Sequence, residues 1–300
     1  MKKTLYYTDH YEILLPVGHK FPMAKYRMVR EALQRSDAAR LHFEPAPLAS
    51  AEVIELTHDA EYVRQFLGGT LSALAMRRIG FPWSEELVGR TLASVGATLC
   101  ATTEALATGW GGTLAGGTHH AFRAEGSGFC VFNDIAVSIC DAFSRGMVER
   151  AAVIDCDVHQ GDGTAQIFEH DARVFTVSIH SKTNFPFRKQ QSKLDIDLPD
   201  GAGDETYLCA LDHALPQVYA FDPQVIIYQA GVDGLAGDTL GHLKLSHAGL
   251  RERDRRIFEA ARARGVPIVV TIGGGYSIPV GPTVEAHANT YRAAADVFCI

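Results

Sequence analysis

The 300-residue sequence has little that would place it among secreted, membrane or disordered proteins. Its six cysteines include no C-x-x-C pair, so neither a disulfide framework nor a thiolate zinc knuckle is indicated, and we expect a reducing, cytoplasmic location. No apolar run approaches the ~18 residues of a membrane span, and no secretory signal follows Met1-Lys2-Lys3. Repeats, low-complexity tracts and Pro/Ser linkers are also missing, so we expect a single domain over residues 1–300.

The sequence also lacks an excess of basic residues. Lysine and arginine number 28 against 35 aspartates and glutamates, a formal net charge of −7 with histidine neutral. We therefore expect no direct nucleic-acid binding, and the sign mildly favours a cationic partner. With 47% apolar residues, the chain has enough hydrophobic surface for a large core.

Short apolar runs alternate with longer amphipathic segments, a pattern that predicts an α/β fold with a mostly parallel sheet flanked by helices. The clearest strands are expected at 151–155, 174–179, 225–229 and 267–272, with a fainter one at 113–115. Helices are expected at 22–36, 58–67, 84–108 and 246–265, the last two beginning at Ser84 and Ser246.

Polar residues follow four of the expected strands. Ligand sites in open parallel sheets lie beyond the carboxyl ends of the strands, so these segments should meet at one edge. Taken singly, each has an ordinary explanation as a turn, a helix cap or a core residue, but four such coincidences favour a functional site. The segments are Gly116-Gly117-Thr118-His119-His120, Asp155-Cys156-Asp157-Val158-His159, Ala230-Gly231-Val232-Asp233-Gly234 and Gly273-Gly274-Gly275-Tyr276.

The second of these segments has the spacing of a metal site. Asp155, Asp157 and His159 are two residues apart, so in an extended chain they project from one face. Aspartate with histidine suits Zn²⁺, with Fe²⁺ or Co²⁺ also possible, and Asp233 could supply a third ligand. Three protein ligands leave a position open, which is typical of catalytic zinc sites.

The motifs at 116–121, 155–163, 233–238 and 273–276 resemble those of the zinc-dependent histone deacetylase family, which has the arginase/deacetylase fold. Segments 19–26 and 78–84 look most like its class IV branch and the bacterial histone-deacetylase-like amidohydrolases. The resemblance covers nearly the whole chain. It implies one catalytic domain on a sheet of about eight strands.

The resemblance implies a role for each of eight polar residues. It implies zinc ligands at Asp157, His159 and Asp233, proton transfer by His119 and His120 paired with Asp155 and Asp162, and an oxyanion donor at Tyr276. His120 would be the base and return a proton to the leaving amine, which releases lysine and acetate. Gln160 replaces a histidine found in many members, but not at a ligand position. The acidic loop residue of several relatives has no clear counterpart, since Glu85 and Glu86 are explained as helix N-terminal charges.

The resemblance also implies a narrow substrate tube and bound potassium. The implied substrate-binding residues are Gly128, Phe129, Phe185, Leu240 and Gly274. One implied potassium ion would use Asp155, Asp157, His159, Ser178 and Ile179, largely through main-chain oxygens, and a second would use Phe168, Asp171 and Val174.

Several functions remain open at this point. The first is a metal-dependent amidohydrolase that deacetylates acyl-lysine in proteins or peptides. The others are a deacetylase of acetylpolyamines or other small acylated amines, a fatty-acyl-lysine deacylase, and a non-catalytic deacetylase-like scaffold. A scaffold would be expected to have lost some of the eight polar residues, and all are present. A nucleotide-binding domain would need a G-x-G-x-x-G motif after the first strand, which is missing.

Overall fold

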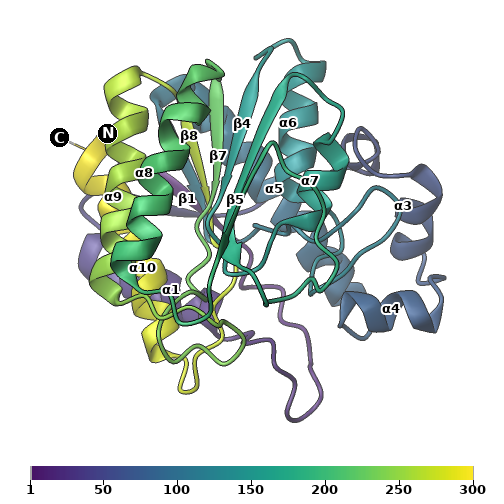
Figure 1. The fold of residues 1–300 in the computed structure, drawn as a ribbon. Helices are drawn as coiled ribbons and strands as arrows, with labels where there is room; N and C mark the ends of the chain where they lie inside the picture. Colours follow the sequence, from purple (N-terminus) through teal and green to yellow (C-terminus); the bar gives the residue numbers. More distant parts are fainter. Residues whose placement is uncertain (1, 300) are drawn as a thin grey trace.

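The computed structural model describes residues 2–299 and contains one eight-stranded sheet with helices on both faces (Figure 1). Every strand pair is parallel, and the strand order is β2-β1-β3-β8-β7-β4-β5-β6. The α/β class and the eight strands are confirmed. No helix within residues 2–299 is both long enough and apolar enough to cross a membrane.

The sheet and helices have the following bounds. The strands are β1 (Lys3–Tyr7), β2 (Leu41–Pro45), β3 (Trp110–Thr113), β4 (Ala151–Asp155), β5 (Val174–Ser181), β6 (Leu194–Leu198), β7 (Val225–Gln229) and β8 (Ile268–Thr271). The helices are α1 (Lys25–Asp37), α2 (Ala51–Ile54), α3 (Ala60–Leu67), α4 (Ala73–Ile79), α5 (Glu85–Thr108), α6 (Asp134–Ser144), α7 (Asp162–Phe168), α8 (Asp204–Ala220), α9 (His247–Arg264) and α10 (Gly281–Phe298).

Helices α5 and α9 begin where expected because serine side chains cap them. Ser84 Oγ accepts a hydrogen bond from the Leu87 amide at 3.1 Å, and Ser246 Oγ accepts one from the Gly249 amide at 2.9 Å. The expected strand at 113–115 was misplaced, since β3 ends at Thr113. Its centre is glycine because α5 packs directly against it: a Cβ on Gly111 would lie 2.1 Å from the Ala101 carbonyl oxygen.

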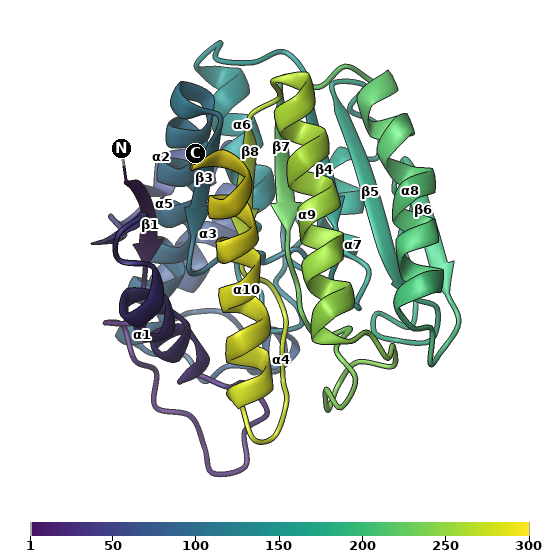
Figure 2. The ribbon, with the colours of Figure 1, turned by 90° about the vertical axis from the view of Figure 1, so that its left-hand side faces the viewer.

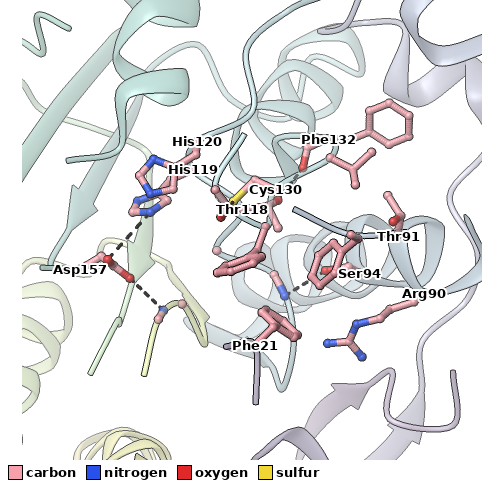
Figure 3. Close-up of a pocket in the computed structure, with 18 of the residues that line it drawn as sticks. Phe21, Arg90, Thr91, Ser94, Thr118, His119, His120, Cys130, Phe132 and Asp157 are labelled. Atoms are coloured by element: carbon pink, nitrogen blue, oxygen red, sulfur yellow. Dashed lines mark hydrogen bonds and ion pairs between the residues drawn. The ribbon is translucent and has the colours of Figure 1, made fainter. Parts of the chain in front are cut away.

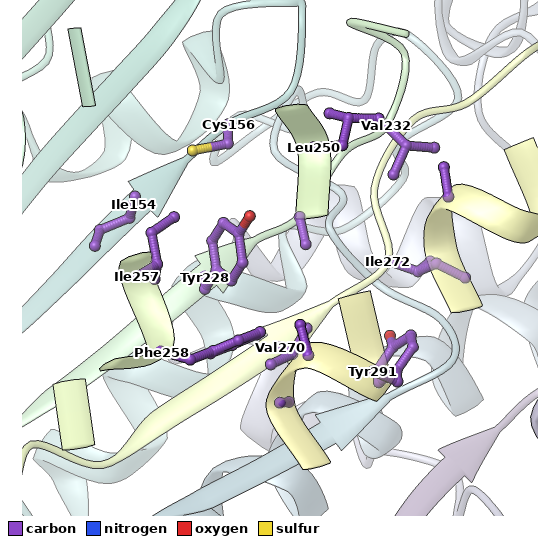
Figure 4. Close-up of a cluster of buried hydrophobic side chains, with 14 of the residues drawn as sticks. Ile154, Cys156, Tyr228, Val232, Leu250, Ile257, Phe258, Val270, Ile272 and Tyr291 are labelled. Carbon is purple, nitrogen blue, oxygen red and sulfur yellow. The ribbon is translucent and has the colours of Figure 1, made fainter. Parts of the chain in front are cut away.

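The hydrophobic core lies on both faces of the sheet. Ile154 of β4 packs in the cluster beneath α8, α9 and α10, whereas its neighbour Val153 packs in the cluster beneath α5 and α6. Figure 4 shows the first cluster, in which Tyr228 and Val270 of adjacent strands lie against Phe258 of α9. Figure 2 shows α8, α9 and α10 side by side over that face. The strands are therefore held on both faces, and their carboxyl ends form a firm platform.

Candidate active site

Four adjacent central strands carry the four sequence motifs. β3, β8, β7 and β4 are consecutive in the sheet, and each is followed by one motif at its carboxyl end. The prediction that these segments meet at one edge is therefore borne out by the topology.

Asp157, His159 and Asp233 form a buried metal-ligand cluster. Each offers one ligand atom, and these atoms lie within 4.8 Å of one another. His159 faces both carboxylates with Nδ1, which is 2.9 Å from Asp157 Oδ1 and 3.1 Å from Asp233 Oδ2. Two carboxylates and an imidazole are a donor set that fits Zn²⁺.

Glycines leave the space that these ligands occupy. A Cβ on Gly274 would lie 2.0 Å from Asp233 Oδ2, and one on Gly231 would lie 2.3 Å from Asp157 Oδ2. The Gly274 amide donates to Asp157 Oδ2 at 2.8 Å, which orients that carboxylate. Gly274 therefore makes room for the ligand cluster and orients it, whereas its implied contact with substrate stays a prediction.

Burial and the close contacts among the three ligand side chains shift their pKa values. Burial lowers the pKa of His159, but its bonds to Asp157 and Asp233 outweigh burial and raise the pKa to about 10. Burial and the Asp157 charge raise the pKa of Asp233 to about 7. Burial also opposes ionisation of Asp157, yet His119 and His159 hold the pKa of this carboxyl well below its usual range. A metal ion that binds here must displace protons.

The tandem histidines lie beside this cluster, each paired with its own aspartate. His119 Nδ1 donates to Asp155 Oδ2 and His120 Nδ1 donates to Asp162 Oδ1, both at 2.6 Å. The two ring centroids are 4.1 Å apart. These bonds fix the tautomer, so Nε2 is the nitrogen left to exchange a proton with a substrate.

The environments of the two imidazoles drive their pKa values apart. Burial and the charge of His119 lower the pKa of His120 to about 4 despite Asp162. Burial also acts against protonation of His119, but Asp155 and Asp157 outweigh it and raise the pKa to about 9. A cation in the cluster would lower both values. His120 is therefore the imidazole that stays neutral and can accept a proton.

Tyr276 reaches the same site from the loop after β8. Its amide donates to Asp238 Oδ2 at 2.6 Å, and its carbonyl accepts from Thr239 Oγ1 at 2.7 Å. Gly273, three residues before it, has φ +61°, a conformation that glycine adopts without strain. Desolvation and the charges of Asp233 and Asp157 raise the pKa of Tyr276 well above its usual value, so its hydroxyl remains a donor.

The predicted tube residues lie around two spaces that share several lining residues. Gly128, Phe129, Phe185 and Leu240 border an open cleft of about 630 Å³ that also reaches His120 and Tyr276. Phe185 meets the His120 ring edge-on with centroids 5.0 Å apart. A smaller internal cavity of about 80 Å³ lies behind the histidines (Figure 3). Figure 3 shows His119, His120 and Asp157 on one side of this cavity, with Phe21 and Arg90 across from them.

The residues implied for potassium occupy two places beside β5. Ser178 is the register partner of Asp155 in the adjacent strand. Phe168 ends α7, and the turn through Asp171 leads into Val174 at the start of β5. Both sets are close in the chain fold, but potassium binding itself stays a prediction.

Sequence reasoning missed three residues that position the site. Asp134 accepts from the amides of Gly117 and Thr118 at 3.1 and 2.7 Å and so holds the turn before the histidines. Gln229, the last residue of β7, donates to Asp157 Oδ2 at 3.0 Å. Asp238 anchors Tyr276, although it belongs to a motif that was noticed. Only Gln229 could have been found by the strand-end rule.

An ion-binding cluster that could activate water, next to an imidazole able to carry its proton, defines a metal-dependent hydrolase. Comparison with known proteins narrows this class. The histone deacetylase domain model matches residues 19–291. The histone deacetylase-like amidohydrolase of Pseudomonas aeruginosa is 32% identical over 87% of this chain and 73% of its own length.

Two further relatives differ in how much of their own length is matched. An uncharacterized protein of Picosynechococcus is 41% identical over 97% of this chain and 98% of its own length. Histone deacetylase 2 of Arabidopsis thaliana is 37% identical over 68% of this chain and 51% of its own length. The crystal structure of the HDA15 HD domain superposes with a TM-score of 0.80 at 21% identity, over 99% of this chain and 91% of that one, a likeness of fold.

This chain belongs to the histone deacetylase family and is a metal-dependent amidohydrolase.

Proposed function

We propose that this protein is a zinc-dependent deacylase that hydrolyses the amide of N-acetyl-lysine, or of lysine with a longer acyl group, in proteins or peptides. The observation that carries the proposal is the convergence of Asp157, His159 and Asp233 on one point beside the paired histidines. An aromatic and aliphatic cleft wall suits the uncharged methylene chain of an acyl-lysine. Bound zinc would polarise the acyl carbonyl and lower the pKa of the attacking water.

His120 and Tyr276 carry the proton and charge changes in this proposal. His120 takes a proton from the attacking water at Nε2, since Nδ1 is bonded to Asp162. The resulting imidazolium returns that proton to the leaving amine. Tyr276 donates its hydroxyl proton in a hydrogen bond to the carbonyl oxygen as negative charge develops there. His119, which is paired with Asp155, is the more basic of the two imidazoles.

The experiment is zinc analysis coupled to hydrolysis of an acetyl-lysine peptide. Asp233→Ala is expected to lose both bound zinc and activity, because it removes one of three ligands. Asp212→Ala, on the exposed surface of α8, is the matched control and should retain both. Retention of zinc without activity in Asp233→Ala would reassign Asp233. A zinc-loaded protein that hydrolyses no acyl-lysine peptide contradicts the proposal.

The other enzyme candidates, an acetylpolyamine deacetylase and a fatty-acyl-lysine deacylase, differ in substrate and share the metal chemistry. Peptides with longer acyl chains, and acetylspermidine as a small acylated amine, belong in the same assay.

We also propose that potassium binds at the two places beside β5 described above, which potassium-dependent thermal stability would test.

A further inference from the structure

The charge at the mouth of the active-site cleft is opposite to that of the whole protein. Three permanently charged side chains line the cleft, Lys20, Arg77 and Arg78, and all are positive. None of its lining residues within 2–299 is an aspartate or glutamate. The chain as a whole has a net charge of −7. We call these three residues the basic rim.

The basic rim is tied by hydrogen bonds to the wall of the cleft. The Arg78 carbonyl accepts from the Gly128 amide at 3.2 Å, and the next carbonyl, of Ile79, accepts from the Phe129 amide at 2.8 Å. On the other side, His19 Nε2 lies 2.8 Å from the Gly80 carbonyl oxygen, which draws Lys20 towards the end of α4. The backbone that carries the three positive side chains therefore has a defined position relative to the tube.

Two of the three charges are available to a ligand. Arg78 pairs with Glu125, but Lys20 and Arg77 are exposed and form no ion pair with another residue of the described chain. Arginine at the end of α4 complements the helix dipole, yet that reason does not apply to Lys20, which lies in a loop.

Glu125 neutralises Arg78, but the other carboxylates beside the cleft do not line it. Asp200 lies across the cleft, 3.6 Å from His242, and does not line it. Asp238 does not line the cleft either, and its carboxylate accepts hydrogen bonds from the backbone amides of Tyr276, Leu240 and Gly241. A substrate in the cleft thus lies beside two exposed cations, Lys20 and Arg77, and beside no carboxylate of the lining within residues 2–299.

We propose that the basic rim selects acyl-lysine peptides that carry aspartate or glutamate beside the modified lysine. This inference rests on the proposed deacylase function and names its substrate class. Carboxylates next to the acyl-lysine would pair with Lys20 and Arg77, which steers association and fixes orientation. A polycationic acetylpolyamine meets repulsion at the same place. The rim therefore overrules the mild preference for a cationic partner that the net charge alone suggests.

The test compares three acetyl-lysine peptides that differ only in their flanking residues, two glutamates, two glutamines or two lysines. We expect kcat/KM to fall in that order, with about a tenfold span at low salt, since each exposed pair contributes weakly. The span should shrink at about 1 M salt, where charges are screened within a few ångströms. Acetylspermidine should be the poorest substrate.

Charge reversal identifies the residues responsible. Lys20→Glu combined with Arg77→Glu should invert the ratio between glutamate and lysine peptides, and the double change to glutamine should remove it. Lys2→Glu with Arg264→Glu is the matched control, because it makes the same charge change at exposed sites outside the cleft lining. This control should keep the wild-type ratio.

The outcomes separate this inference from the proposed function. Equal hydrolysis of all three peptides, or an unchanged ratio in the reversed variant, overturns the basic-rim proposal and leaves the deacylase function intact. Absence of hydrolysis of every peptide overturns the function itself. Free Nε-acetyl-lysine also presents a carboxylate, and its preference over every peptide would overturn a peptide as the occupant.

Discussion

Hydrogen bonds to its backbone fix the position of Tyr276. Asp238 accepts a hydrogen bond from its amide, and Thr239 donates one to its carbonyl. The hydroxyl has no hydrogen-bond partner within the described chain and is available to a substrate. Tyr276→Phe is expected to lower kcat by about 10² to 10³, the usual cost of losing one oxyanion donor. The measurement is steady-state hydrolysis of an acetyl-lysine peptide together with metal content, which should not change.

A matched control removes the same atom elsewhere. Tyr219 has a buried hydroxyl without a hydrogen-bond partner on α8, so Tyr219→Phe should leave kcat unchanged. Near-full turnover in Tyr276→Phe would exclude the oxyanion role.

The metal ligands predict a pH dependence of metal binding. His159 has a pKa raised to about 10 and Asp233 one raised to about 7, so near neutral pH both carry protons that an ion must displace. Metal affinity should therefore rise with pH until these groups are deprotonated, by about tenfold per displaced proton per pH unit. Calorimetry in buffers of different ionisation enthalpy should detect between about one and two protons released. A pH-independent affinity would contradict this protonation pattern.

At the scale of elements, α9 connects the two loops that carry the metal ligands. Arg253 is 1% exposed and donates from Nη1 to the Gly231 carbonyl at 2.7 Å and the Cys156 carbonyl at 3.3 Å. Its Nε donates to Asp254 at 2.9 Å, and Thr290 of α10 donates to the same carboxylate at 2.7 Å. One guanidinium thus joins the ends of β4 and β7 from behind the site.

Arg253→Met should cost about 3–5 kcal/mol in the free energy of unfolding, because it leaves the Asp254 carboxylate buried and unpaired. It should also weaken metal binding, since Asp157 directly follows Cys156 and Asp233 lies two residues after Gly231. Urea denaturation and competition with a chelator measure these effects. Arg255→Met, on the exposed face of α9, should cost about 1 kcal/mol or less. Lost stability with unchanged metal affinity would show that the arginine supports only the fold.

The elements also show how far the sequence predicts the fold. β4, β5, β7 and β8 were predictable because burial on both faces produces continuous apolar runs. β2 and β6 are half-exposed edge strands, and their mixed composition gives no clear strand pattern in the sequence. The sequence also pointed to eight polar residues that the structure brings together, because they follow central strands or match family motifs, and their roles stay predictions. Asp134 was not predictable, because its partners are backbone amides of a loop about 16 residues away.

At the scale of the whole molecule, metal binding should stabilise the folded chain. An ion at a concentration 100-fold above its Kd contributes about 2.7 kcal/mol if it binds only the folded state. For 300 residues this corresponds to a rise in Tm of about 4 °C. Differential scanning calorimetry of the chelator-treated protein with and without added zinc measures the shift. Asp233→Ala should show no rise, and a similar rise in that variant would place the ion elsewhere.

The strands that carry the reacting groups occupy the middle of the sheet, with β1 and β2 on one side and β5 and β6 on the other. Amide hydrogens in the centre of a sheet exchange with deuterium last, because only extensive unfolding exposes them. β7 and β8 should therefore be the slowest segments and β2 among the fastest. Local unfolding of the outer strands leaves the reacting groups in place. Catalysis should therefore not depend on the motions of the outer strands.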